Sequence, residues 1–195
     1  MSRSGRIAAI LLLAAVAGTA YADDPDRVPS GSPADPPVLR WYYNPHGEPA
    51  WLDGEGRKRV EEAIEAWAPC GVRFEFAGET DQSPGLRDGR NVIGWDAGLG
   101  PGQRAITKTM MKRDGKVVER DVAFNSSRAE FRLHPRLLRK VMMHEFGHVL
   151  GLKHSPDCRD VMSLGADCRR VAPDELPLVP TENDLERCRA STGPS

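Results

Sequence analysis

Three histidines and one glutamate stand close together in the last third of the chain, at His144, Glu145, His148 and His154. In a helix, residues four apart project from the same face, so the imidazoles of His144 and His148 can reach one ion. Gly151 can adopt a positive φ that ends such a helix and turns the chain back, which brings His154 toward the same point. The spacing therefore predicts a metal site with three nitrogen ligands.

The number of ligands predicts which kind of metal site this is. Three protein ligands leave one position open for water, whereas a structural zinc has four protein ligands. Bound zinc lowers the pKa of water from about 15.7 to about 7, which makes hydroxide available at neutral pH. Glu145 directly follows the first ligand, and we expect it to act as the general base that takes the proton and delivers it to a leaving amine. The pattern therefore indicates a hydrolytic zinc centre.

The two other histidines in the mature chain are not expected to bind metal. His46 stands alone, and His134 precedes a proline at the start of a predicted helix, where surface or capping roles are typical. We therefore expect one catalytic zinc ion per chain and no further cofactor site, and the sequence leaves calcium binding undecided.

The paired histidines belong to a predicted helix that runs from His134 to Leu150. Its apolar residues recur at spacings of three and four and form one buried face. They are Leu137, Leu138, Val141, Met142, Phe146 and Val149. A first amphipathic helix is predicted over residues 52–68 and a C-terminal helix over residues 181–189.

Five other segments are predicted to be strands because strand-forming residues dominate them or apolar and polar residues alternate. They are residues 38–43, 72–76, 91–95, 105–112 and 116–125. Asp114-Gly115 between the last two is typical of a tight hairpin. In the second segment, Val72, Phe74 and Phe76 are expected on one half-buried face. We therefore expect an α+β fold with a five-stranded twisted sheet in one domain, residues 38–195.

The first 22 residues have the features of a signal peptide. Arg3 and Arg6 give a positive start, residues 7–17 are apolar, and Ala20-Tyr21-Ala22 resembles a cleavage site. The apolar stretch is much shorter than the roughly 20 residues of a membrane span. We expect cleavage after Ala22, secretion to the periplasm or the cell exterior, and no membrane attachment of the mature chain.

The composition predicts a disordered segment before the folded domain and argues against nucleic-acid binding. Residues 23–37 hold five prolines and four aspartates, so we expect a disordered linker or a short pro-segment. The formal net charge of -1 offers no strongly basic surface, and we expect no nucleic-acid partner.

Four cysteines remain in a chain that is expected to reach an oxidising compartment. Three connectivities of two disulfides are possible. We favour Cys158 with Cys168 and Cys70 with Cys188, because this pairing closes one short loop and ties the end of the chain to its middle.

The segment from His144 to His154 resembles the zinc-binding motif of the metzincin metalloproteases, most closely that of the matrixins, the family of the matrix metalloproteinases. Ser155 follows the third histidine as in matrixins, and Asp160-Val161-Met162-Ser163 resembles the Met-turn. The resemblance implies a metzincin catalytic domain with an active-site helix, a Met-turn and a C-terminal helix. It also implies that Met162 forms an apolar floor beneath the zinc.

The resemblance further implies that the edge strand over residues 105–112 pairs with an extended substrate. Two features depart from the family. Residues 23–37 contain no cysteine, so a cysteine-switch pro-domain is not expected. All tyrosines precede residue 44, so transition-state stabilisation is expected from zinc and the backbone.

Together, these features predict a monomeric, secreted zinc-dependent endopeptidase that acts on a protein or peptide in extended conformation. One alternative is a catalytically silent, zinc-stabilised binding module, which Glu145 makes less favourable because a structural role needs no proton acceptor there. Another is a zinc amidase that acts on cell-wall peptides, which the sequence hardly separates from a protease.

Overall fold

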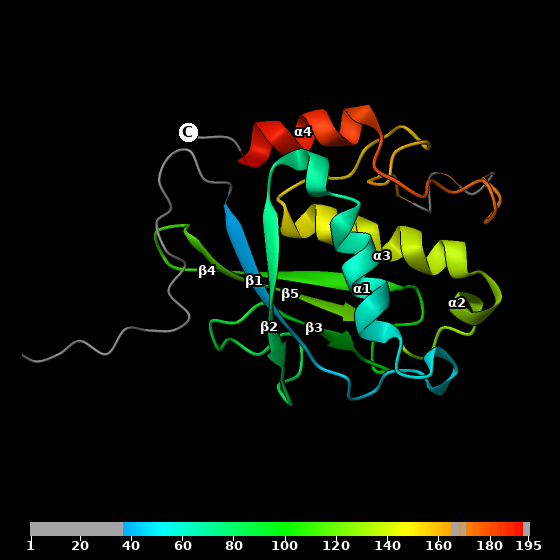
Figure 1. Ribbon diagram of the computed structural model, residues 1–195, viewed down its shortest axis with the longest axis horizontal. Coiled ribbons are helices and arrows are strands. Elements are labelled where there is room, and N and C mark those ends of the chain that lie inside the picture. The colour runs from blue at the N-terminus through cyan, green and yellow to red at the C-terminus, as the bar shows by residue number, and fades with distance from the viewer. Residues whose placement is uncertain (1–36, 165–167, 169–170, 193–195) are drawn as a thin grey trace, which may run out of the picture.

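A five-stranded sheet forms the centre of the computed structural model, which describes residues 37–164, 168 and 171–192 (Figure 1). The strand order is β2-β1-β3-β5-β4, and all neighbours are parallel except β4 and β5. The strands are β1 (Val38–Tyr43), β2 (Arg73–Glu79), β3 (Val92–Trp95), β4 (Ala105–Met111) and β5 (Val117–Phe124). All five predicted strands are therefore confirmed, and β4 forms an antiparallel edge.

The helices cover one face of this sheet. They are the 3-10 helices η1 (Ala50–Leu52) and η2 (Ala68–Cys70) and the α-helices α1 (Gly56–Glu65), α2 (Glu130–Leu133), α3 (Pro135–Val149) and α4 (Glu182–Thr192). α1 and α3 pack against each other on the sheet, and α4 lies beyond them, beside η2 (Figure 1). The long helix predicted around the histidines is confirmed as α3.

The predicted helix over residues 52–68 was too long. α1 is ten residues long, and a 3-10 turn lies on each side of it. Asp53 and Gly54 both have positive φ, 51° and 78°, which is incompatible with a continuing right-handed helix. Pro69 lies within the second turn. The short helix α2 was not predicted.

The hydrophobic core lies between the sheet and helices α1 and α3. Trp67 is fully buried there, and its Nε1 donates to the carbonyl of Met143 at 3.0 Å. Val72, Phe74 and Phe76 lie together on the side of β2 that faces α1, as predicted, although Phe76 is 38% exposed because β2 is a sheet edge. The Phe76 ring lies 4.9 Å from that of Trp41 and beneath the guanidinium of Arg57.

Both predicted disulfides are confirmed. Cys70–Cys188 joins η2 to α4, and Cys158–Cys168 closes a short loop. The first bridge closes a loop of more than one hundred residues, which restricts the unfolded chain strongly.

The predicted signal peptide and all of the predicted linker except Pro37 lie outside the described residues. Within residues 37–164, 168 and 171–192, no helix has the length and apolar character that a membrane span requires.

Candidate metal centre

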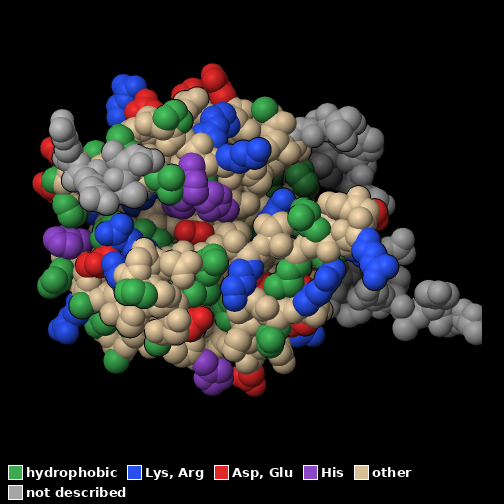
Figure 2. Space-filling view, turned by 180° about the vertical axis from the view of Figure 1, so that it is seen from behind, with side chains coloured by type: hydrophobic (Ala, Val, Ile, Leu, Met, Phe, Trp, Pro, Cys, Tyr) green, Lys and Arg blue, Asp and Glu red, His purple; other side chains and the backbone are tan. Residues whose placement is uncertain are grey.

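The three histidines of the sequence motif converge at the C-terminal end of α3. One ring nitrogen of each of His144, His148 and His154 lies within 4.8 Å of the others, and the two Nε2 atoms of His148 and His154 are 3.1 Å apart. Figure 2 shows histidine side chains on the wall of a hollow that crosses one face of the molecule, with an acidic side chain inside it.

The turn that brings the third histidine back follows from Gly151, which has a φ of 90°. Its N–H donates to the carbonyl of His148, and the N–H of Leu152 donates to that of Gly147, both at 2.9 Å. This pair of hydrogen bonds is a Schellman motif, which ends a helix and reverses the chain. The predicted helix stop is therefore confirmed.

Backbone carbonyls orient the two helical imidazoles. Nδ1 of His144 donates to the carbonyl of Val161 at 2.9 Å, and Nδ1 of His148 donates to that of Leu152 at 2.8 Å. The Nε2 atoms are thereby left to face the common point. Burial lowers the pKa of His144 to about 3 and also lowers the pKa of His148, so both rings are neutral at neutral pH, as metal binding requires.

This donor set fits zinc. Neutral imidazole nitrogens are common zinc ligands, and the second ring nitrogen of each such ligand is usually hydrogen-bonded as seen for His144 and His148. Among the described residues, no other cluster of histidine, cysteine or carboxylate groups could hold a metal ion. His46 instead lies 3.0 Å from Asp81 at the surface, and His134 precedes the first turn of α3.

Glu145 lies beside the histidines and is held by a residue that sequence reasoning missed. The hydroxyl of Thr107, on the edge strand β4, donates to Oε2 of Glu145 at 2.7 Å and lies 3.1 Å from its main-chain carbonyl. Burial raises the pKa of Glu145, and the Thr107 hydrogen bond opposes this rise. No sequence signal links residues that are 38 positions apart, so only the fold reveals this contact.

A buried lysine lies one turn before the first histidine of the motif. Nζ of Lys140 donates to the carbonyl of Ser163 at 2.7 Å, which ties α3 to the segment after Met162. Burial lowers the pKa of Lys140 to about 8. Periodicity did not predict this buried charge.

Met162 is fully buried and lies against Gly147. A Cβ on Gly147 would collide with Sδ of Met162 and lie 3.1 Å from the Trp67 ring. The position between the two helical histidines therefore requires glycine, because any side chain there would displace Met162. Met162 thus lies against α3 between the two helical histidines, and its role as the floor beneath a zinc ion stays a prediction.

Comparison with models of known protein families shows to which family this chain belongs. A family model described as Matrixin matches residues 39–172, more than half of the chain. The chain belongs to the matrixin family. It is accordingly a zinc metallopeptidase with a metzincin-type α+β fold, as the resemblance implied.

Solved structures to which the chain is similar include an archaemetzincin, a metalloproteinase and a zinc-dependent peptidase. Archaemetzincin from Methanopyrus kandleri has 16% identity and a TM-score of 0.49, with 79% of this chain and 95% of that chain covered. Metalloproteinase-II from Bacteroides fragilis has 12% identity, a TM-score of 0.47, and coverage of 85% and 56%. A zinc-dependent peptidase from Methanocorpusculum labreanum has 11% identity, a TM-score of 0.43, and coverage of 79% and 99%. No curated protein sequence matches the chain.

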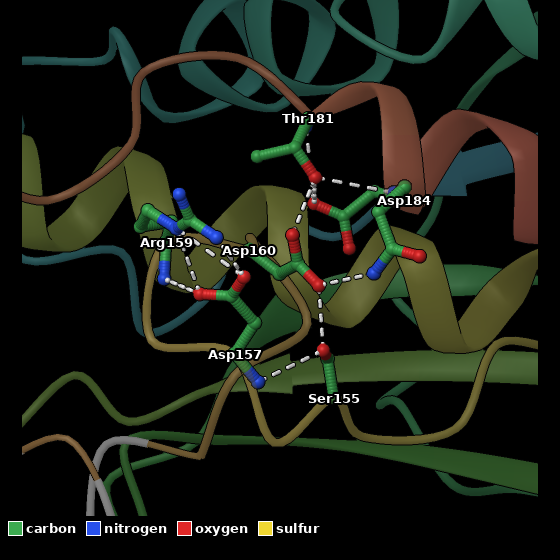
Figure 3. Close-up of polar contacts among 7 residues, drawn as sticks. Ser155, Asp157, Arg159, Asp160, Thr181 and Asp184 are labelled. Atoms are coloured by element: carbon green, nitrogen blue, oxygen red, sulfur yellow. Dashed lines mark hydrogen bonds and ion pairs between the residues drawn. The ribbon is translucent and has the colours of Figure 1, made fainter.

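Around the Met-turn of this matrixin, a buried carboxylate joins two segments (Figure 3). Asp160 is 1% exposed and accepts hydrogen bonds from Ser155 Oγ and Thr181 Oγ1, both at 2.5 Å, and from Asn183 Nδ2 at 2.6 Å. Ser155, the residue after the third histidine, is thus tied to the start of α4. Sequence analysis did not assign a role to Asp160.

Asp184 supports the Met-turn from the other side. Its carboxylate accepts the N–H groups of Val161 at 2.7 Å and Met162 at 3.4 Å. Reciprocal hydrogen bonds with Thr181 form the capping arrangement predicted for this helix start. Because the carbonyl of Val161 accepts from His144, a chain of contacts leads from α4 to the metal centre.

Replacing Asp184 by alanine is expected to lower the free energy of unfolding by about 3 kcal/mol, because buried N–H groups lose a charged acceptor. Zinc affinity is expected to fall about 10- to 100-fold as His144 loses its orientation. Denaturant unfolding and zinc competition with a chromogenic chelator would measure both effects. Glu186→Ala, an exposed change in the same helix, is the control, and equal effects of the two substitutions would contradict this role of Asp184.

Proposed function

We propose that this matrixin is a secreted endopeptidase in which His144, His148 and His154 hold one zinc ion and Glu145 is the general base. The proposal rests on one observation: three oriented imidazoles converge beside a buried carboxylate, next to the edge strand β4. We assign residues 1–22 to a signal peptide, residues 23–37 to a linker or short pro-segment, and residues 38–195 to the catalytic domain. Two disulfides support an oxidising compartment as the destination.

When bound, zinc supplies Lewis acidity, which lowers the pKa of water and polarises a carbonyl group. The other tasks belong to the chain itself. Glu145 accepts the proton of the attacking water on its carboxylate and passes it to the departing amine. Carbonyls of Val161 and Leu152 keep the imidazoles of His144 and His148 in place during the reaction.

β4 is the element on which we expect a substrate to lie. It is an edge strand, so its outer main-chain groups are open to pairing with an extended peptide. Its Thr107 reaches Glu145, so a peptide on this edge passes close to the general base. This arrangement suits cleavage within a polypeptide, because an extended chain can continue past the site in both directions.

The proposal is tested by zinc analysis combined with cleavage of unfolded protein and a peptide library. We expect one zinc per chain and internal cleavage that stops when a chelator removes the metal. Stoichiometric zinc without any chelator-sensitive cleavage would instead support the silent binding module. Release of small amides without cleavage of peptides would support the amidase.

Thr107 is proposed to position the general base. Thr107→Val removes the hydroxyl that holds Glu145 and is expected to lower kcat about tenfold, the equivalent of one hydrogen bond to a charged group. KM should change little, because the hydroxyl is bonded to the enzyme carboxylate and not to substrate. Thr107→Ser keeps the hydroxyl and should restore most of kcat in steady-state assays. Equal kcat values for the valine variant and the wild type would remove Thr107 from the mechanism.

A further inference from the structure

The side chain of Arg120, in β5, has no partner among the residues that the structure describes. Its Nε is buried and forms no hydrogen bond, and no ion pair or hydrogen bond to its guanidinium is found in that part of the chain. Desolvation lowers the pKa of Arg120, with no contribution from a nearby carboxylate. A partly buried charge without a partner is unfavourable, and an anionic group from outside the chain would offset this cost.

Strand geometry shows why the neighbouring carboxylates do not pair with Arg120. Glu119 and Asp121 both point to the other face of the sheet, because side chains alternate along a strand. There, Glu119 accepts the N–H of Gly89 at 2.6 Å and Asp121 accepts that of Val92 at 2.8 Å. Arg120 therefore lies on the face that carries α3, apart from both carboxylates.

This face places Arg120 close to the metal centre. Arg120 is paired with Thr109 of β4, two residues beyond Thr107, and two residues of a strand span about 7 Å. Its Nη2 lies 3.9 Å from the position that a Cβ on Gly151 would occupy. The guanidinium thus lies between the edge strand and the loop that returns to His154.

Other cations surround this end of the hollow. The β4–β5 turn carries exposed basic residues, and Arg87 donates to the carbonyl of Met111 beside it. On the opposite side, Arg187 donates to the carbonyl of Lys153. The turn contributes Lys112, Arg113 and Lys116, with Asp114 as its acidic residue. Figure 2 shows Lys and Arg side chains on both rims of the hollow to the right of the histidines.

We propose that Arg120 binds an acidic side chain of the substrate and that the hairpin end of the hollow thereby selects acidic polypeptides. This inference rests on the proposed function, because the substrate is taken to pair with β4. A guanidinium matches a carboxylate in two parallel hydrogen bonds. From the register, the acidic residue lies within about three positions of the scissile bond, on the side that faces the β4–β5 turn. The surrounding lysines and arginines attract such chains before the specific contact forms.

The test uses internally quenched peptides that differ by one substitution of glutamate for glutamine at successive positions. For the wild-type protein, kcat/KM is expected to rise about 10- to 100-fold for glutamate at one or two positions on a single side of the scissile bond. Arg120→Gln should cleave the glutamate and glutamine peptides at equal rates, and Arg120→Lys should keep part of the preference. The higher kcat/KM of the glutamate peptides should come mainly from a lower KM, and the difference should decrease at high ionic strength.

Arg132→Gln is the matched control, because Arg132 is exposed on α2 at the other end of α3, and it should keep the full preference. Thermal unfolding should show that Arg120→Gln is at least as stable as the wild type, since it removes an unpaired charge. Equal cleavage of both peptide types by the wild type, or a preference that survives in Arg120→Gln, would overturn the inference and leave the proposed function intact. Absence of any chelator-sensitive cleavage would overturn both.

Discussion

Glu145→Gln is expected to lower kcat/KM by about 10³- to 10⁴-fold, the contribution of a positioned general acid and base. The amide has nearly the same shape as the carboxylate, and its oxygen can still accept the hydrogen bond of Thr107. The substitution therefore removes the proton acceptor and little else. Glu145→Ala should reduce the rate at least as much, because it removes the side chain as well as its charge.

Zinc content separates this effect from damage to the metal centre. Both variants should hold as much zinc as the wild type, since the three converging nitrogens belong to histidines and Glu145 supplies no ligand atom among them. Steady-state assays and metal analysis on the same samples provide the comparison. A glutamine variant with more than a tenth of wild-type kcat/KM would show that another group accepts the proton.

His154→Ala is expected to abolish chelator-sensitive cleavage and to reduce bound zinc from one ion per chain to a small fraction at submicromolar free zinc. With two ligands left, the remaining imidazoles cannot close a catalytic zinc site. His154 is exposed, outside the hydrophobic core, so the metal-free fold should remain. Added zinc should raise the unfolding temperature of the wild type but not of the variant, because only a bound ligand stabilises the folded state.

His46→Ala is the matched control, since His46 is an exposed histidine paired with Asp81 away from the motif. It should keep zinc, activity and the stabilisation by zinc. Wild-type zinc affinity in His154→Ala would show that the ion is held elsewhere. Loss of zinc in His46→Ala would show that the ligand set has been assigned wrongly.

The proposed metal centre depends on four separate parts of the chain. α3 carries two imidazoles and the carboxylate, and the loop after Gly151 carries the third imidazole. The Met-turn supplies the carbonyl of Val161, and α4 supplies Asp184 to hold that turn. The disulfide Cys70–Cys188 anchors α4 to η2. Substitutions that displace α4 are therefore expected to weaken zinc binding at the proposed metal centre.

Local sequence predicted those features that depend on near neighbours. Apolar periodicity located α3, Gly151 located its end, and Asp114-Gly115 located the β4–β5 hairpin. The same rules failed at Asp53, where a non-glycine residue has positive φ, and the predicted helix over residues 52–68 proved to be three shorter ones. Alternation correctly placed Phe76 on the same face as Val72 and Phe74, but it could not show that β2 is a sheet edge, where Phe76 stays 38% exposed.

By itself, the sequence determined the types of chemical group at the centre. The spacing of His144, Glu145, His148 and His154 follows from the geometry of one helix and one glycine turn, so distant residues were not needed to predict it. Only the tertiary structure showed that Thr107 holds Glu145, that Asp184 holds the Met-turn and that the Arg120 side chain has no partner among the described residues. These contacts join residues far apart in the chain, and strand order and register decide them, so no local pattern encodes them.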